Sequence, residues 1–186
     1  RVIIGRLEAG KMVYRVVNSC LLPLVEAAGC HIITIEGLNQ EKLTPVQEIL
    51  VGMGAIQCGY CSPGLVISIT GFLLSSAEIN EEKAIDSADV LCRCTGYSAT
   101  KRAIKELCSE YSFPNDPDLK IAALVSSRIL PEYFQDIAKE LEKIKAQNSL
   151  NELSPPPVNS LPIAGGTDIF TRTHVSLAKE KLFFLK

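Results

Sequence analysis

The sequence predicts an α+β fold in which short strands come first and helices follow. Apolar and polar residues alternate over residues 1–19 and again over 31–38, which is the two-residue period of a half-buried strand. From residue 43 onward the apolar residues recur at helical spacing and helix-start signals appear. The chain also has seven cysteines, and four of them form two close pairs that are typical of metal ligation.

The strand-forming segment has three parts. The strings RVIIG (residues 1–5) and MVYRVV (12–17) flank the turn EAGK, and HIITIEGL (31–38) is expected to form a third strand. Three strands are too few to close a sheet. We therefore expect residues 1–40 to be the end of a small β-rich domain whose beginning precedes Arg1.

Four helices are predicted within residues 41–113, and together they predict a compact bundle. The first begins with a capping box: Thr44 supplies the capping hydroxyl, Pro45 occupies the first helical position, and Gln47 follows two residues later. The third begins at a capping asparagine followed by two glutamates, which suit the positive end of the helix dipole. The expected helices run from Pro45 to about residue 56, after Pro63, after Asn80 and from Ser98.

The rest of the chain carries weaker patterns. The string FPNDPD breaks the chain after the bundle, and residues 114–130 are interpreted as a linker. An amphipathic helix is expected from Pro131, and the string LPIAGGTDIFTR (161–172) predicts a strand that leads into a Gly-Gly turn. The apolar stripe of the expected helix consists of Phe134, Ile137, Leu141 and Ile144.

The paired cysteines lie in two connections of the predicted bundle. Cys58 and Cys61 separate the first two helices, and Cys92 and Cys94 separate the last two, so both pairs can meet at one end of the bundle. Four thiolates suit either Zn²⁺ or an iron–sulfur cluster, and the spacing leaves both open. Two disulfides are disfavoured because a bridge between Cys92 and Cys94 would be strained. Cys108, on the apolar stripe of the fourth helix, is expected to pack in the core.

Composition and motifs exclude several functions. The chain is 47% hydrophobic and 22% charged with a net charge of −2, so it lacks the basic surface of a nucleic-acid-binding protein. It has no apolar run of the length that spans a membrane. Neither a nucleophile–base arrangement, nor paired catalytic carboxylates, nor a Walker loop is present. We therefore expect a metal-binding chain without bond-breaking chemistry of its own, in a reducing, cytoplasmic compartment and with no nucleic acid or membrane partner.

Several strings resemble one family. QCGYCSPG followed by CRCTGY resembles the second [2Fe–2S] domain of the molybdenum hydroxylases, the family of xanthine dehydrogenases and aldehyde oxidases. VNSCLLPL and TIEGL are similar to the end of its plant-ferredoxin-type domain, and LPEYF with LPIAGGTDIF resembles the start of its flavin domain. This order is most similar to the iron–sulfur and FAD small subunit of bacterial xanthine dehydrogenases. The resemblance implies a remnant of a β-grasp ferredoxin-like domain (1–40), a four-helix [2Fe–2S] domain (41–113), a linker (114–130) and the start of an α/β FAD-binding domain (131–186).

The resemblance also implies roles for residues of the helical domain. Gln57 matches a glutamine that contacts the molybdopterin of a partner unit, and Cys94 matches the cluster ligand nearest that pterin. The sequence departs from the family where Asp89 and Val90 replace Gly-Asn before the second cysteine pair. That change is expected to alter the turn and hence the cluster potential. The implied ligands of the [2Fe–2S] cluster are Cys58, Cys61, Cys92 and Cys94.

Two further sites are implied in part. Cys20 matches the last of four ligands of the ferredoxin-type cluster, and the third would fall immediately before Arg1, so we expect this chain to hold one cluster. The AGGTD string matches the first FAD-diphosphate loop of the family, where backbone N–H groups face phosphate. FAD binding would need the remainder of the flavin domain. The residues of this expected loop are Ala164, Gly165, Gly166, Thr167 and Asp168.

The resemblance therefore implies an oxidoreductase component that passes electrons from a molybdopterin site through [2Fe–2S] to FAD. Substrate chemistry would belong to a molybdopterin-binding large subunit, which is the expected partner together with the rest of the FAD domain. Two alternatives stay open. The substrate could be an aldehyde or an N-heterocycle other than xanthine, or the chain could be a zinc-bound or metal-free scaffold without redox function.

Overall fold

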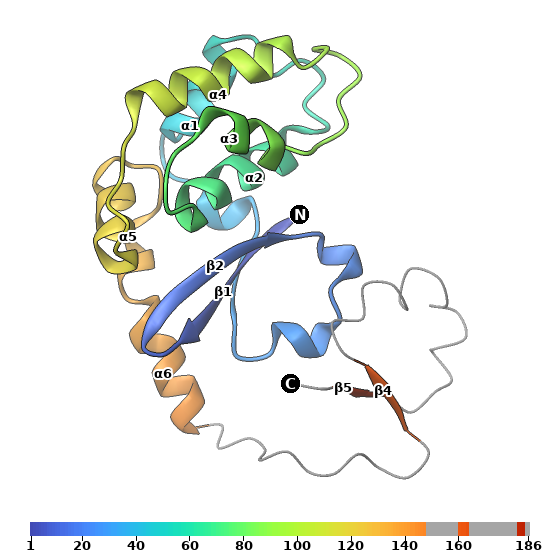
Figure 1. The fold of residues 1–186 in the computed structure, drawn as a ribbon, viewed down its shortest axis with the longest axis vertical. Coiled ribbons are helices and arrows are strands. Elements are labelled where there is room, and N and C mark those ends of the chain that lie inside the picture. Colours follow the sequence, from blue (N-terminus) through green and yellow to red (C-terminus); the bar gives the residue numbers. More distant parts are fainter. Residues whose placement is uncertain (148–159, 164–181, 185–186) are drawn as a thin grey trace.

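The computed structural model describes residues 1–147, 160–163 and 182–184. A three-stranded antiparallel sheet lies in the middle of the view in Figure 1, and four helices gather on one side of it. The central strand pairs with both neighbours, with Ile3 opposite Val16 on one side and opposite Ile33 on the other. The strands, in the spatial order β2-β1-β3, are β1 (Val2–Glu8), β2 (Lys11–Val17) and β3 (His31–Ile33). The strand-first, helix-later order predicted from the sequence is confirmed.

The helical part contains the four predicted helices. All four begin within two residues of their expected positions, and the capping box of Thr44 with Gln47 forms as predicted. Asn80 likewise caps the third helix by accepting a hydrogen bond from the Lys83 N–H at 3.1 Å. Removing such a cap costs about 1 kcal/mol. The helices are α1 (Pro45–Gly52), α2 (Ser62–Ser75), α3 (Glu81–Ser87) and α4 (Ser98–Glu110).

Helix α2 is the centre of the core. Every residue from Leu65 to Leu74 is buried, as expected for a helix that is apolar on all sides. It packs on the sheet at Gly71, where a side chain would collide with Val16 of β2 and press on Ile3 of β1. On its other sides it contacts α1 and α3, and these in turn pack against α4. The ends of α2 are therefore fixed by the sheet below it and by the other helices beside it.

The remaining described elements extend from this body. The structure places a helix, α5, inside the segment for which the sequence predicts a linker, because Asp116 accepts hydrogen bonds from the N–H groups of Asp118 and Leu119. Lys11 of β2 forms an ion pair with Asp116 at 2.9 Å, which ties α5 to the sheet. The further elements are α5 (Pro117–Ser126), α6 (Ile137–Gln147) and the parallel pair β4 (Leu161–Ile163) and β5 (Leu182–Phe184).

Three predicted boundaries differ from the structure. The first helix ends at Gly52, because the chain reverses and the Ala55 N–H bonds the Leu50 carbonyl at 2.9 Å. The third strand stops at Ile33 and is followed by a short 3₁₀ turn. The helix expected from Pro131 begins as a separate 3₁₀ turn. The 3₁₀ turns within the described residues are Ser19–Leu21, Leu24–Ala27, Glu36–Leu38 and Glu132–Gln135. Among the described residues, no helix is long and apolar enough to cross a bilayer.

An aromatic cluster joins the sheet to the 3₁₀ turn that precedes α6. His31 of β3 lies 5.2 Å from Phe134 and 5.8 Å from Tyr133 between ring centroids. Its Nδ1 is 3.3 Å from the Tyr14 hydroxyl. Burial in this cluster lowers the pKa of His31 to about 4 from its usual 6.5. The imidazole is therefore neutral in the fold at pH values where it is protonated in the unfolded chain.

This depressed pKa predicts a pH-dependent stability. The unfolded chain takes up the His31 proton near pH 6.5 and the folded chain near pH 4, so stability falls as the pH is lowered through this window. We expect a loss of about 2 kcal/mol, less than the full shift because the ring is partly exposed. Urea unfolding between pH 7 and 4 measures it. His31→Phe keeps the aromatic packing and should lack this part of the slope, and equal slopes would contradict the prediction.

Candidate metal centre

The two cysteine pairs lie in the connections α1–α2 and α3–α4, as the sequence predicts. Both connections lie at the same end of the helices (Figure 1). Cys61 directly precedes α2, and its neighbour Cys58 lies in the turn before it. Cys92 and Cys94 lie between the end of α3 and the start of α4. Cys58 and Cys94 are exposed and the other two thiols are half-buried, and all four are free of disulfides.

The thiols of Cys58 and Cys94 are neighbours across the two connections. The backbone N–H of Tyr60 is the largest influence that lowers the pKa of Cys58, and the Cys94 thiol is the next. The Cys58 thiol in turn raises the pKa of Cys94. Opposite shifts of this kind are expected when two ionisable groups share one proton-binding site. This pair brings together one thiol from each connection.

Cys61 and Cys92 form the second cross-connection pair. Burial raises the pKa of Cys61, and the nearby Cys92 thiol adds to this effect. The pKa of Cys92 is lowered to about 7, chiefly by the hydroxyl of Thr95, whose Oγ1 lies 3.3 Å from the Cys92 sulfur. The Thr95 backbone N–H adds to this effect. A thiol with such a pKa is substantially ionised at neutral pH, which is the form that binds metal.

The turn that carries Cys92 and Cys94 has an unusual backbone. Gly96 and Tyr97 both have left-handed φ angles, of 60° and 67°, immediately before α4 begins. The conformation folds the Tyr97 ring back so that its hydroxyl accepts a hydrogen bond from the Cys92 N–H at 3.1 Å. A left-handed tyrosine is uncommon and is maintained by such compensating contacts. Tyr97 therefore helps to fix the Cys92 turn, a role that the sequence alone did not indicate.

The donors around these thiols fit a thiolate-ligated iron–sulfur cluster. The buried Ser62 Oγ, next to Cys61, lacks a hydrogen-bond partner among the described residues. A buried hydroxyl without a partner is costly, and a sulfur atom at this position would satisfy it. Within the described ranges, the side chains do not form a ready-made group of three or more His, Cys, Asp or Glu ligands. The thiols meet in two pairs, and the Cys92 thiol also acts on the pKa of both members of the other pair, Cys58 and Cys94.

The other predicted site residues lie apart from these pairs or outside the described ranges. Cys20 is exposed in the 3₁₀ turn that follows β2. Gln57 is exposed and directly precedes Cys58. Cys108 is partly buried against the core on α4, as predicted. The expected FAD loop, residues 164–168, lies outside the residues that the structure describes.

Two large apolar side chains near the cysteines are almost fully exposed. Tyr60 lies between the first two cysteines and is 93% exposed, and Leu91 precedes Cys92 and is 90% exposed. Sequence patterns did not single out either residue, because exposure of one apolar side chain in a loop has no periodic signal. Each of the two cysteine connections therefore exposes one large apolar side chain beside its cysteines.

Comparison with known proteins identifies the family. Residues 34–105 match the [2Fe-2S] binding domain family, and this segment contains both cysteine pairs. Xanthine dehydrogenase 1 of Arabidopsis thaliana is 46% identical over 89 residues, which cover 46% of this chain and 6% of that protein. Aldehyde oxidase 2 of Rattus norvegicus is 38% identical over 97 residues, which cover 50% of this chain and 7% of that protein. This chain belongs to the molybdenum hydroxylase family.

The family match concerns a small part of each relative. Among solved structures, quinoline 2-oxidoreductase from Pseudomonas putida 86 is 30% identical, covers 68% of each chain and has a TM-score of 0.46. The curated relatives are oxidoreductases, and the chain spans less than a tenth of the length of those named above. What this molybdenum hydroxylase chain shares with them is the [2Fe-2S] binding domain.

A cysteine inside the thiol pairs and a cysteine outside them should respond differently to substitution. Cys92→Ser should abolish the visible absorption of an iron–sulfur cluster, because it removes one of four expected ligands, a thiol whose pKa is lowered to about 7. Cys108→Ser, on the buried face of α4, should retain the absorption and lower the free energy of unfolding by about 1–3 kcal/mol. Absorption spectra and urea unfolding of the reconstituted variants test both. Equal absorption in Cys92→Ser and the unmodified chain would refute ligation by Cys92.

Proposed function

We propose that the chain transfers electrons in a xanthine-dehydrogenase-like molybdenum hydroxylase, from a molybdopterin site through a [2Fe–2S] cluster to FAD. One observation carries the proposal: thiols from two connections adjoin at one end of a domain that matches the [2Fe-2S] binding family. The proposed ligands are Cys58, Cys61, Cys92 and Cys94. When bound, a [2Fe–2S] cluster accepts and releases one electron at a time.

The chain's own residues would set the conditions for that transfer. The backbone N–H of Tyr60 and the hydroxyl of Thr95 stabilise thiolate charge on Cys58 and Cys92. The unpartnered hydroxyl of Ser62 is available to donate a further hydrogen bond to sulfur. Hydrogen bonds to sulfur stabilise the more negative, reduced state and so raise the potential. Rigid helix ends keep these donors in place while charge changes.

The exposed side of the site is suited to a partner. Cys94 and Gln57 are exposed, and Tyr60 and Leu91 project from the same two connections. We propose that the molybdopterin-binding unit docks here, with Gln57 in contact with the pterin. Exposed ligand sulfur shortens the distance to a donor in that unit. The apolar side chains would be buried by docking and exclude water from the contact.

The other parts of the chain would connect this site to FAD. We propose the domain limits 1–40 for the ferredoxin-like part, 41–113 for the [2Fe–2S] domain, 114–130 for the linker and 131–186 for the start of the flavin domain. Cys20, exposed in the turn after β2, would be one ligand of a second, ferredoxin-type cluster. Residues 164–168 would contact the FAD diphosphate together with the rest of the flavin domain.

The proposal predicts the metal content of the chain. Anaerobically purified protein of this sequence should contain about two irons and two acid-labile sulfides, with a red-brown spectrum that bleaches on one-electron reduction. Metal analysis with a dithionite titration measures this. Zinc without sulfide, or no metal at all, would refute the electron-transfer role and leave a scaffold. About four irons would contradict the expectation of one cluster per chain.

Docking predicts a selective effect of Gln57→Ala in the assembled enzyme. The variant should keep its metal content and spectrum but bind the molybdopterin unit up to about tenfold more weakly, because one interfacial hydrogen bond contributes about 1 kcal/mol. Gln40→Ala is the control, since the Gln40 amide bonds the Arg128 carbonyl instead. Electron transfer from the molybdopterin unit, measured by stopped flow, distinguishes them. Equal rates in both variants would leave Gln57 without a docking role.

A further inference from the structure

Arg1 occupies a position where the sheet, two helices and the Cys92 connection meet. Its side chain is 16% exposed although it precedes the first strand. The guanidinium group donates to Asn18 Oδ1 at 3.2 Å and to Ser68 Oγ at 2.7 Å. It also contacts the Ser87 carbonyl at 3.5 Å and the Asp89 carboxylate at 3.2 Å. One side chain thus bonds four residues from three separate segments of the chain.

Two of the residues that Arg1 bonds lie shortly before a cysteine in the chain. Asn18 lies two residues before Cys20, at the start of the 3₁₀ turn that carries it. Asp89 lies three residues before Cys92, in the connection from α3. Arg1 therefore bonds simultaneously to the segment that leads into Cys20 and to the segment that leads into Cys92.

The hydrogen bond from Arg1 to Ser68 also reaches α2, the helix that begins directly after Cys61. Ser68 accepts from Arg1 and donates to the Gly64 carbonyl at 2.8 Å, within the first turn of α2. Gly64 in turn lies against Val90 of the Cys92 connection, where an added Cβ would be 3.4 Å from a Val90 methyl. The first turn of α2 and the approach to Cys92 are therefore held side by side, with Arg1 supporting both.

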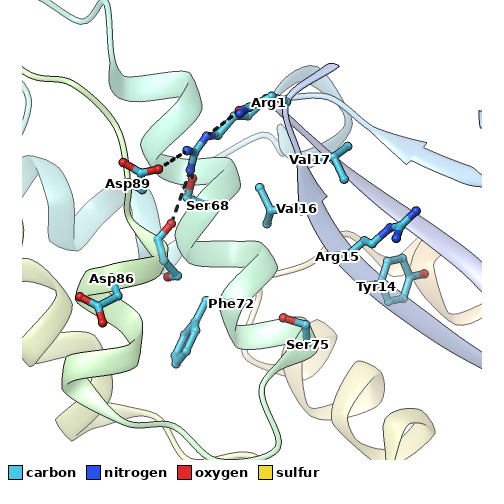
Figure 2. A pocket seen from close by; sticks show the side chains of 12 residues that line it. Arg1, Tyr14, Arg15, Val16, Val17, Ser68, Phe72, Ser75, Asp86 and Asp89 are labelled. Carbon is cyan, nitrogen blue, oxygen red and sulfur yellow. Dashed lines mark hydrogen bonds and ion pairs between the residues drawn. The ribbon is translucent and has the colours of Figure 1, made fainter. Parts of the chain in front are cut away.

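Arg1 shares its pocket with a second arginine, Arg15. The Arg1 side chain lies on one wall of a pocket of about 400 Å³ between β2 and the helices. In Figure 2, Arg1 reaches toward Asp89 and Ser68, while Arg15 projects from β2 and points away from them. Arg15 lines the same pocket, but its side chain has no hydrogen-bond or ion-pair partner among the described residues. Two arginines of equal charge therefore differ in their contacts, and they provide a matched comparison.

The contribution of Arg1 lies in the arrangement of its hydrogen bonds and not in the strength of its ion pair. Asp89 is 83% exposed, and an ion pair with so exposed a carboxylate adds little to stability. The planar guanidinium has five N–H donors in a fixed arrangement, which suits it to hold several acceptors at set angles. We propose that Arg1 is a positioning residue that fixes the Cys92 connection relative to the Cys20 turn. The functional part of this inference rests on the proposed electron-transfer role, in which it would set the spacing of the two iron–sulfur sites.

Amide hydrogen exchange on the metal-free chain tests the positioning directly. Arg1→Ala should speed exchange in peptides covering residues 88–97 and 18–22 by roughly three- to tenfold, since these segments lose shared hydrogen bonds. Arg15→Ala should leave both segments unchanged. Arg1→Lys keeps the positive charge but loses the planar guanidinium with its five N–H donors, so we expect it to resemble Arg1→Ala. Equal exchange in the two alanine variants, or unmodified behaviour of Arg1→Lys, would overturn the proposal.

The loaded protein provides a readout that general loss of stability would not move. Arg1→Ala should retain its iron and sulfide but show an altered electron paramagnetic resonance spectrum of the reduced cluster, and Arg15→Ala should not. Identical spectra in the three proteins would contradict positioning of Cys92. If the unmodified chain binds no cluster, the electron-transfer proposal fails, while the exchange experiment still decides the role of Arg1.

Discussion

Burial of helix α2 is the constraint on which the candidate site depends. The helix has no exposed face between Leu65 and Leu74, so it is stable only when the sheet, α1 and α3 cover it together. Its first residue follows Cys61, so packing in the core fixes the position of that cysteine. Helices α3 and α4, held on the same body, fix the ends of the second cysteine connection. The thiols meet because the helices that flank them share one core.

The connections themselves combine rigidity with exposure. Left-handed residues before α4, the Tyr97 hydroxyl and the Thr95 hydroxyl hold the Cys92 turn, yet Cys94 remains at the surface. An electron-transfer site needs both properties. Fixed donors keep reorganisation small when the charge changes, and surface sulfur permits close approach of a partner. Tyr60 and Leu91 extend this surface with apolar area.

Contacts between the sheet and the helices join these two parts of the fold. Arg1 bonds the helices at one end of the sheet, and Lys11 bonds Asp116 of α5 at the end of the β1–β2 hairpin. The aromatic cluster around His31 adds a third contact, with the turn before α6. Exposed ion pairs of this kind contribute little free energy each. Of these contacts, the hydrogen bonds of Arg1 join the segment before Cys20 to the segment before Cys92.

The sequence by itself determined the strand-to-helix order, the helix starts and the two cysteine connections. These depend on local chemistry, such as the Thr44–Gln47 capping box and the alternation of β1 and β2, and local patterns survive folding. The helix at Pro117 also had a local signal, the capping Asp116, which the proline-rich context obscured. Only the tertiary structure decided which thiols pair, how Tyr97 supports Cys92 and what Arg1 holds. Those contacts join residues far apart in the chain, and no local period records which distant segments the core will bring together.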